Sequence, residues 1–271
     1  MDEPAGPTDP QVSFISVQSA EGRPIVLYAN YSLHYVGGVG PGHISADYFG
    51  AFASRMGELL GAERQDPPFV GIMSNGTSGD INNIDFRGGQ TRQPPYGQIK
   101  LVANDVAQEV ARVCKSVTYH DWVPLASAQK ELQLALRLPT AAEVGKAREV
   151  MKQSKLYPRM ETMEQVYSRE TVLLSEFPAQ VSAPLQVLKI GELRVSAIPA
   201  EVFVEIGLEL KQRHAQTFTV SLANAYHGYL PTPKHHGLGG YETWRARSSC
   251  LEVDASTKIV AGLEELFKKL E

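Results

Sequence analysis

The sequence predicts a mixed α/β (α+β) fold, with a central mixed β-sheet flanked by helices and a helical insert. Three observations favour it. Short runs of β-type residues alternate along the chain with longer segments whose apolar residues recur at helical spacing. The apolar run at residues 69–73 leads directly into a polar loop punctuated by glycine. Thr140 and Glu143 form a capping box that opens a helical stretch in the middle of the chain.

The first half of the chain is expected to open with a β-hairpin, because residues 12–17 and 24–31 are β-type and a turn at residues 20–23 joins them. Ser45 is placed to cap the helix that follows, and Gly61 is placed to end it. The elements expected next are a helix at 46–60, a strand at 69–74, an exposed loop at 84–97 and a helix at 99–114.

The second half is expected to begin with an extended segment at residues 117–138. The capping box then starts a helix that runs to about residue 155, and a second helix at 161–175 completes the helical insert at residues 139–176. The elements expected after the insert are strands at 184–190 and 193–198, a helix at 201–214, a β run at 217–223, a long loop at 226–241 and an amphipathic helix at 255–270.

Composition limits the classes of function. With 271 residues, of which 43% are hydrophobic and 21% charged, the chain can bury a sizeable core, and we expect one domain over residues 1–271. A net charge of -4 gives no electrostatic footprint for nucleic acid. No run approaches the roughly 18 to 20 apolar residues of a membrane span, and the first residues lack the features of an export signal. Cys114 and Cys250 are interpreted as buried thiols rather than a bridge.

The loop from Asn75 to Asn83 is the first candidate for chemistry, because binding and catalytic groups are often carried on loops that a rigid strand positions. Asp80 and Asn82 are placed to orient a substrate. Ser78 is a nucleophile only if a base lies beside it, and no local sequence supplies one. The nucleophile-elbow pattern G-x-S-x-G also fails, because the two glycines around Ser78 are three residues apart where the motif needs four.

Three residues outside the loop are candidates for metal binding, each with a structural alternative. His34 ends an apolar strand before a glycine-rich turn, so its imidazole can face a cleft, although most histidines bind nothing. Glu201 lies at a strand-to-helix junction, where a carboxylate also simply complements the helix dipole. Tyr241 lies in a loop, where an aromatic side chain usually only covers the core.

Histidines near Tyr241 compete for the same role. His227, His235 and His236 all lie in the loop expected at residues 226–241. Adjacent residues on an extended chain point to opposite faces, so His235 and His236 would bind one ion together only through an unusual turn. We interpret that pair as part of a solvated loop.

Together these segments resemble the catalytic domain of the neutral/alkaline non-lysosomal ceramidases, particularly its divergent bacterial members. The matches agree with the family in order and approximate spacing and span residues 8 to about 245. They are the strand entry Thr8-Asp9-Pro10-Gln11-Val12-Ser13, the strand Asn30-Tyr31-Ser32-Leu33-His34, the helix start Ile44-Ser45-Ala46-Asp47-Tyr48-Phe49-Gly50, the loop Ser78-Gly79-Asp80-Ile81-Asn82-Asn83, the junction Pro199-Ala200-Glu201, and Asn224-Ala225-Tyr226-His227-Gly228-Tyr229 leading to Tyr241.

The resemblance implies a zinc-dependent amidohydrolase, whose family cleaves the N-acyl amide of ceramide to a sphingoid base and a fatty acid. It implies His34, Glu201 and Tyr241 as ligands of one Zn2+ ion, which activates a water for attack on the amide carbonyl. The loop is then expected to stabilise the oxyanion and bind the substrate. Its expected catalytic residues are Asn82, Asp80 and Gly79, and its expected substrate-binding residues are Asn75, Ser78 and Asn83.

Two departures separate the sequence from the family pattern. The family's serine, regarded there as catalytic, falls on Asn82, whose amide nitrogen cannot act as a nucleophile. Metal-activated water is therefore favoured over a protein nucleophile. The family's His-x-His segment, which supplies a further zinc ligand, occurs nowhere in the sequence. We expect an N-terminally incomplete domain with an incomplete zinc site.

Two alternatives remain open. A catalytically silent ceramidase-like fragment would keep the fold and bind a lipid or a protein partner, and a serine hydrolase would use Ser78. The resemblance implies a small-molecule lipid amide as substrate, peripheral membrane contact, and a secreted or periplasmic protein. The sequence itself leaves localisation and oligomeric state open.

Overall fold

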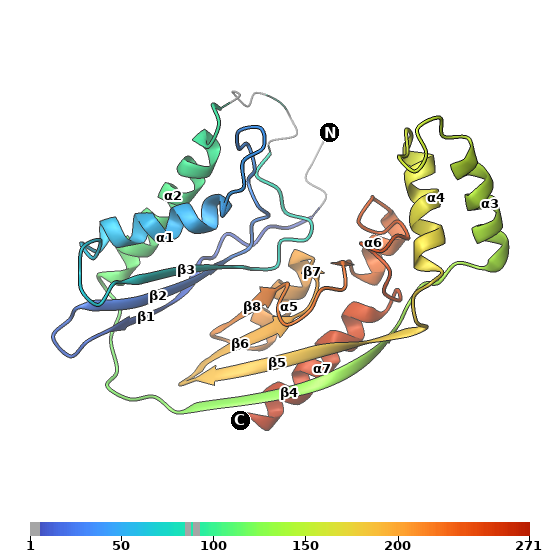
Figure 1. Cartoon of the computed structure of the whole chain (residues 1–271). Helices are drawn as coiled ribbons and strands as arrows, with labels where there is room; N and C mark the ends of the chain where they lie inside the picture. The colour runs from blue at the N-terminus through green and yellow to red at the C-terminus, as the bar shows by residue number, and fades with distance from the viewer. Residues whose placement is uncertain (1–5, 85–87, 89–92) are drawn as a thin grey trace.

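Two mixed β-sheets with helices packed against them form most of the structure, which is a computed structural model (Figure 1). It describes residues 6–84, 88 and 93–271. The loop expected at residues 84–97 therefore lies partly outside the described residues. The mixed α/β class is confirmed, although the described strands divide into two sheets and a separate strand pair rather than one central sheet.

The first sheet has two helices on one face. Its elements are β1 (Ser13–Gln18), β2 (Pro24–Tyr31), α1 (Asp47–Leu59), β3 (Val70–Asn75) and α2 (Gly97–Cys114). The expected hairpin is confirmed, because β1 pairs with β2 antiparallel, whereas β3 pairs with β2 parallel after a crossover through α1. Alternate residues of a strand face the same way, so Leu27 and Ala29 of β2 are both fully buried in a cluster with Phe52 and Met56 of α1.

The second sheet orders its strands β4-β5-β6-β8 and contains the other main buried cluster. Its elements are β4 (Leu125–Ala135), β5 (Gln180–Ile190), β6 (Leu193–Ile198), α5 (Val204–Arg213), β8 (Thr217–Ser221) and α7 (Ala255–Lys269). The parallel strands β6 and β8 are joined through α5, and α7 lies along the sheet (Figure 1). Gly262 of α7 approaches β5 so closely that an added Cβ would lie 2.9 Å from Leu185.

Two expectations in the second half are wrong in detail. The helix expected at residues 201–214 begins only at Val204, because Glu201 belongs to β7 (Glu201–Val202), which pairs parallel with β9 (Tyr229–Leu230). The loop expected at residues 226–241 contains β9 and also α6 (Pro233–Leu238), whose N-cap is Thr232. Such short elements leave no measurable periodicity in a sequence, so only their partners in space define them.

The two helices expected between residues 139 and 176 are present as α3 (Ala141–Lys152) and α4 (Met163–Leu174), and Thr140 and Glu143 make both hydrogen bonds of the capping box. In Figure 1 this pair projects beside the second sheet. Three side-chain contacts join this helix pair to the loop after Tyr241. Glu143 forms an ion pair with Arg245 at 2.6 Å, and Glu170 forms one with Arg247 at 2.7 Å. The rings of Tyr167 and Trp244 pack edge-on with their centroids 5.2 Å apart.

The two sheets meet where β2 and β3 pass β8. The side-chain amide of Asn30 in β2 donates to Ser74 Oγ of β3 at 2.9 Å and to the Thr219 carbonyl of β8 at 3.2 Å. The rings of Tyr28 and Phe218 also meet here, with centroids 6.0 Å apart. Loops that follow the carboxyl ends of parallel strands are the usual place for a site in open α/β sheets.

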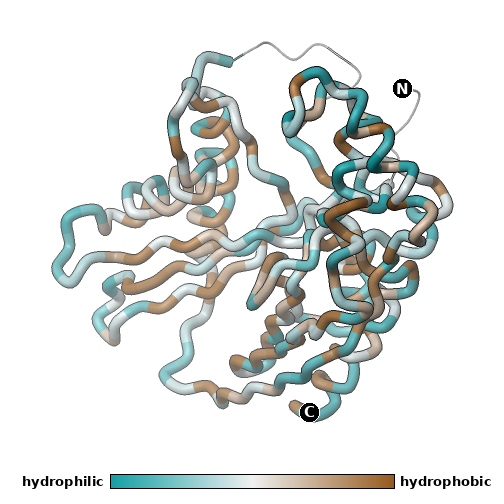
Figure 2. The backbone as a smooth tube through the Cα atoms, turned by 45° about the vertical axis from the view of Figure 1, so that its right-hand side comes forward, coloured by the Kyte–Doolittle hydropathy of each residue, from teal (hydrophilic) through white to brown (hydrophobic). Residues whose placement is uncertain are grey.

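Two further expectations concern the cysteines and membrane spans. Cys114 and Cys250 are both free thiols, the second buried and the first partly so. Figure 2 shows apolar residues recurring along the strands and helices while many outer turns are hydrophilic. Among the described residues, every helix is too short or too polar to span a bilayer.

Candidate metal centre

His34 lies just beyond the end of β2 and is held from both its backbone and its ring. Its backbone N–H donates to the Ile81 carbonyl at 3.2 Å, and its Nδ1 lies 3.0 Å from the Ser78 carbonyl. A carbonyl oxygen only accepts hydrogen bonds, so Nδ1 carries a hydrogen and, in the neutral ring, Nε2 keeps its lone pair. The glycine turn that follows is fixed by Asp47, which accepts the N–H groups of Val36 and Gly37 at 2.8 and 2.7 Å.

Glu201 faces the free nitrogen of that ring. Its Oε2 lies 3.8 Å from His34 Nε2, and the two side chains are only 15% and 20% exposed. Its Oε1 accepts a hydrogen bond from the Tyr226 hydroxyl at 2.8 Å. Burial, followed by this contact with Glu201, raises the pKa of Tyr226 to about 12. The Tyr226 hydroxyl is therefore a donor at neutral pH that orients the carboxylate.

Tyr241 joins the same group through Tyr229. Their hydroxyls are 3.4 Å apart and their rings are perpendicular, with centroids 5.7 Å apart. Burial is the largest cause that raises the pKa of both phenols, and the nearby charge of Glu201 raises both further. The structure thus places His34 beside Glu201, and Tyr241 beside Tyr229, where the charge of Glu201 affects both phenols. The role of all three expected residues as metal ligands remains a prediction. We call His34, Glu201, Tyr226, Tyr229 and Tyr241 the His34–Glu201 cluster.

The loop from Asn75 to Asn83 is clamped between β2 and β7. The Gly76 N–H donates to the Tyr31 carbonyl and the Gly79 N–H to the Val202 carbonyl, each at 2.8 Å. Gly79 has no room for a side chain, because an added Cβ would lie 2.6 Å from the Glu201 carbonyl oxygen. The Gly79 amide expected to stabilise an oxyanion is therefore occupied by β7 in this structure.

Other residues of the loop divide between buried and exposed positions. Ser78 is 1% exposed and its hydroxyl donates to Asn75 Oδ1 at 2.9 Å, so it points to an amide and not to a base. Asn82 is exposed, and Asn83 is half-buried. Any catalytic or substrate-binding role for these residues remains a prediction.

Asp80 turns away from its loop and caps α5. Its Oδ1 accepts the Val204 N–H at 2.9 Å, which supplies the cap that Phe203, at the N-cap position, lacks. Burial and, to a smaller extent, the charge of Glu205 raise the pKa of Asp80 to about 6. This contact fixes the loop to the second half of the chain.

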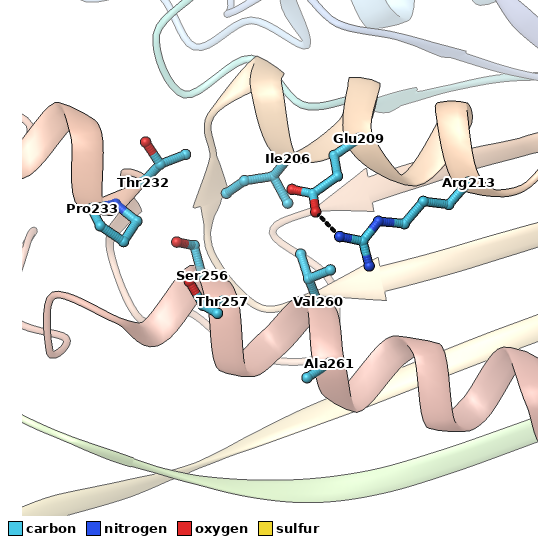
Figure 3. Close-up of a pocket in the computed structure, with 9 residues that line it drawn as sticks. All are labelled: Ile206, Glu209, Arg213, Thr232, Pro233, Ser256, Thr257, Val260 and Ala261. Atoms are coloured by element: carbon cyan, nitrogen blue, oxygen red, sulfur yellow. Dashed lines mark hydrogen bonds and ion pairs between the residues drawn. The ribbon is translucent and has the colours of Figure 1, made fainter.

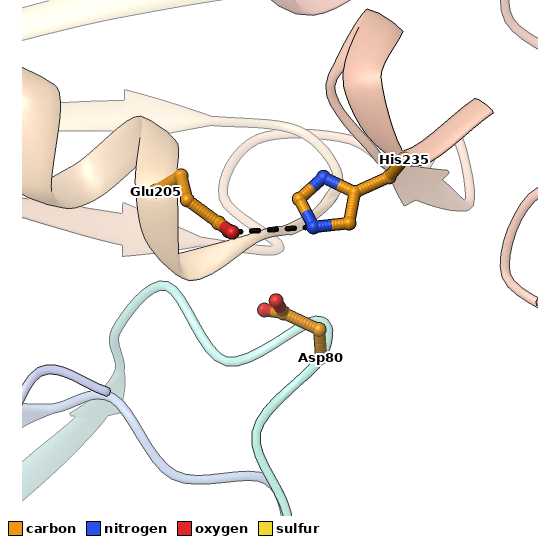
Figure 4. Close-up of side chains that lie close together, drawn as sticks. All are labelled: Asp80, Glu205 and His235. Atoms are coloured by element: carbon orange, nitrogen blue, oxygen red, sulfur yellow. Dashed lines mark ion pairs between the residues drawn. The ribbon is translucent and has the colours of Figure 1, made fainter. Parts of the chain in front are cut away.

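A second group of potential ligands surrounds Asp80 (Figure 4). One ligand atom from each of Asp80, Glu205 and His235 lies within 4.8 Å of the others, and His235 Nε2 lies 3.2 Å from Glu205 Oε1. The interpretation of His235 and His236 as a solvated loop pair is wrong for His235, whose side chain is 14% exposed on α6. Glu205 was not singled out from the sequence, because its position in the first turn of a helix is unremarkable there.

One cavity among the described residues lies outside both groups of potential ligands. It has a volume of about 230 Å³ between α5, α6 and α7, and an ion pair of Glu209 and Arg213 spans one wall (Figure 3). No residue of the His34–Glu201 cluster lines it. The side chains of the His34–Glu201 cluster therefore lie outside this cavity.

Comparisons with known proteins find a likeness of fold. No protein-family model matches the chain, and no curated protein matches it significantly. The structure of neutral ceramidase from Pseudomonas aeruginosa matches with a TM-score of 0.67 at 16% sequence identity, over 96% of this chain and 46% of that one. A structure of ceramidase complexed with C2 matches with a TM-score of 0.66 at 17% identity, over 96% and 49% of the two chains. The chain thus spans about half the length of both structures and has a partial ceramidase-like fold.

Proposed function

We propose that this chain is a zinc-dependent, ceramidase-like catalytic domain that hydrolyses the N-acyl amide of ceramide or a related lipid amide. One observation carries the proposal: His34 Nε2 and Glu201 Oε2 face each other at 3.8 Å in a ceramidase-like fold. The two residues come from opposite halves of the chain. Their approach is therefore a product of the tertiary fold and not of local sequence.

The cluster fits a zinc ion. Two atoms bound to tetrahedral zinc at 2.0–2.2 Å lie about 3.3 Å apart, slightly less than the distance between Nε2 and Oε2. That distance is also too long for a hydrogen bond, so neither atom satisfies the other. Metal-binding histidines usually donate their second ring N–H to a carbonyl or carboxylate, as His34 does to Ser78. Tyr226 supplies the matching contact to Glu201.

Tyr241 completes the donor set that we propose. A zinc ion supplies a Lewis acid for the amide carbonyl and an acidified water at neutral pH. Neighbouring residues of the chain hold and orient the proposed ligands. Tyr226 fixes Glu201, the Ser78 carbonyl fixes the tautomer of His34, and the Tyr229 hydroxyl lies within hydrogen-bond distance of the Tyr241 hydroxyl. The buried Ser78 hydroxyl, directed at Asn75, argues against a serine hydrolase.

The test combines zinc content with turnover of a fluorescent N-acylsphingosine. Wild type is expected to bind zinc at the His34 site and release the labelled fatty acid, and His34→Ala and Glu201→Gln are expected to lose that zinc ion and the turnover. His120→Ala, at an exposed position between α2 and β4, is the matched control and should behave as wild type. Turnover that survives His34→Ala would disprove the proposal. Zinc binding without turnover of any lipid amide would favour a catalytically silent, lipid-binding domain.

A further inference from the structure

We propose that Asp80, Glu205 and His235 form a second divalent cation site, which fastens the loop at residues 75–83 to α5 and α6. Neither His34 nor Glu201 belongs to this group of ligand atoms. The three residues come from a loop of the first half of the chain, the first turn of α5, and α6 (Figure 4). The inference does not depend on the proposed function.

The imidazole of His235 is prepared for a ligand. Its Nδ1 lies 2.8 Å from the Thr232 hydroxyl, and its ring packs edge-on against Phe203 with centroids 4.8 Å apart. Both contacts fix the ring, and Nε2 is the nitrogen that faces Glu205. In a metal-binding histidine the nitrogen that does not bind the metal usually makes a hydrogen bond, which fixes the ring.

Glu205 carries an oxygen that lacks a partner. Its Oε1 faces His235, whereas its Oε2 is buried and has no hydrogen-bond partner among the described residues. A buried carboxylate oxygen without a donor is costly, and native structures seldom leave one. In the part of the chain that the structure describes, no lysine or arginine pairs with Asp80 or Glu205. A cation would supply the missing positive partner to both carboxylates.

The donor set selects the kind of ion. One imidazole and two carboxylates favour Zn2+ or Mn2+, whereas Mg2+ and Ca2+ prefer oxygen ligands alone. His235 Nε2 and Glu205 Oε1, at 3.2 Å, already lie close to the roughly 3.3 Å expected around tetrahedral zinc, and all three ligand atoms lie within 4.8 Å of one another, so small side-chain movements would complete the site. Asp80 can do so with one oxygen while the other keeps the Val204 N–H. The ion would then hold three segments in place.

The experiment counts zinc ions per chain by calorimetric titration of chelator-treated protein with ZnCl2. Wild type is expected to bind one more ion than His235→Gln or Asp80→Asn, with the affinity of that site lowered more than about 100-fold in either variant. Asp80→Asn keeps an oxygen for the Val204 N–H, so it tests the site even if His235→Gln fails to fold. His214→Gln is the control, because His214 pairs with Glu264 at 3.1 Å beside a phenylalanine without a second carboxylate ligand.

Failure of this inference is distinguishable from failure of the proposed function. His34→Ala should remove one ion and leave the Asp80 site intact. If Asp80→Asn and wild type bind the same number of zinc ions with the same affinity, the second site does not exist. If only the Asp80 and His235 variants lose an ion, the second site stands and the zinc site at His34 is refuted.

Discussion

Replacing Gly79 with alanine tests how the candidate site is assembled. The new Cβ would lie 2.6 Å from the Glu201 carbonyl oxygen, 3.0 Å from the Glu201 carbonyl carbon and 3.0 Å from Phe203 Cδ1. Two of these three atoms belong to backbone, which cannot rotate aside. The loop must therefore retreat from β7 and weaken the 2.8 Å hydrogen bond from Gly79 to Val202.

The size of the effect follows from those contacts. Overpacking typically costs about 1–3 kcal/mol, and a lost backbone hydrogen bond adds about 1 kcal/mol. We expect the free energy of unfolding to fall by about 2–4 kcal/mol. For a chain of this size, that change lowers the melting temperature by about 5–10 °C. Because the Ser78 carbonyl moves with the loop and no longer fixes the His34 ring, the zinc affinity of the His34 site should fall by about 10- to 100-fold.

The assay is thermal unfolding by circular dichroism together with zinc titration. Gly145→Ala is the matched control, because Gly145 lies inside α3 with no atom within 4 Å of an added Cβ. The same change should stabilise the protein there by about 0.5–1 kcal/mol. The reasoning is refuted if Gly79→Ala melts within about 1 °C of wild type and binds zinc equally well.

Three further outcomes are expected. Tyr226→Phe should keep the fold but weaken zinc binding at the proposed His34 site about 10- to 100-fold, because it removes the hydrogen bond that orients Glu201. Zinc titration of the chelator-treated variant measures this affinity. Asn82→Ala should leave zinc content unchanged and lower kcat about 100-fold if the side chain stabilises an oxyanion, and an unchanged kcat would exclude that role. Hydrogen bonds, first from Arg245, lower the pKa of Glu143 to about 2, so its contribution to stability is present above pH 4.5 and is lost as pH falls through 2. Urea unfolding should therefore show wild type more stable than Glu143→Gln at pH 6, with a smaller difference near pH 2.5, and a difference that grows on acidification would contradict the assignment.

Local signals made much of the fold predictable. The hairpin of β1 and β2 is encoded by two β-type runs around a short turn, and the start of α3 by the side chains of Thr140 and Glu143. Both depend on residues that are close in sequence. By contrast, β7 and β9 are two-residue strands defined only by each other, so no window of sequence contains their signal.

The candidate site divides in the same way. The resemblance pointed to His34, Glu201 and Tyr241 as metal ligands, which remains a prediction, although the structure places His34 beside Glu201. The sequence could not show that Asp80 caps a helix far away in the chain. His235 was assigned to a solvated loop because adjacent histidines on extended chain diverge. The short helix α6 removes that premise, since it begins at Thr232 through a cap and a proline whose effect depends on the chain around them.

The contacts between the α3–α4 pair and the loop after Tyr241 have a consequence for protein engineering. Two ion pairs and an aromatic contact join these segments, although the residues of the two ion pairs lie 102 and 77 positions apart in the sequence. We therefore expect the loop and the two helices to behave as one packed unit. A graft of the Tyr241 loop into another protein would need to include α3 and α4 in their folded form. Conversely, changes at the far end of α3 and α4 offer a way to adjust the position of a proposed metal ligand without altering any residue that touches the metal.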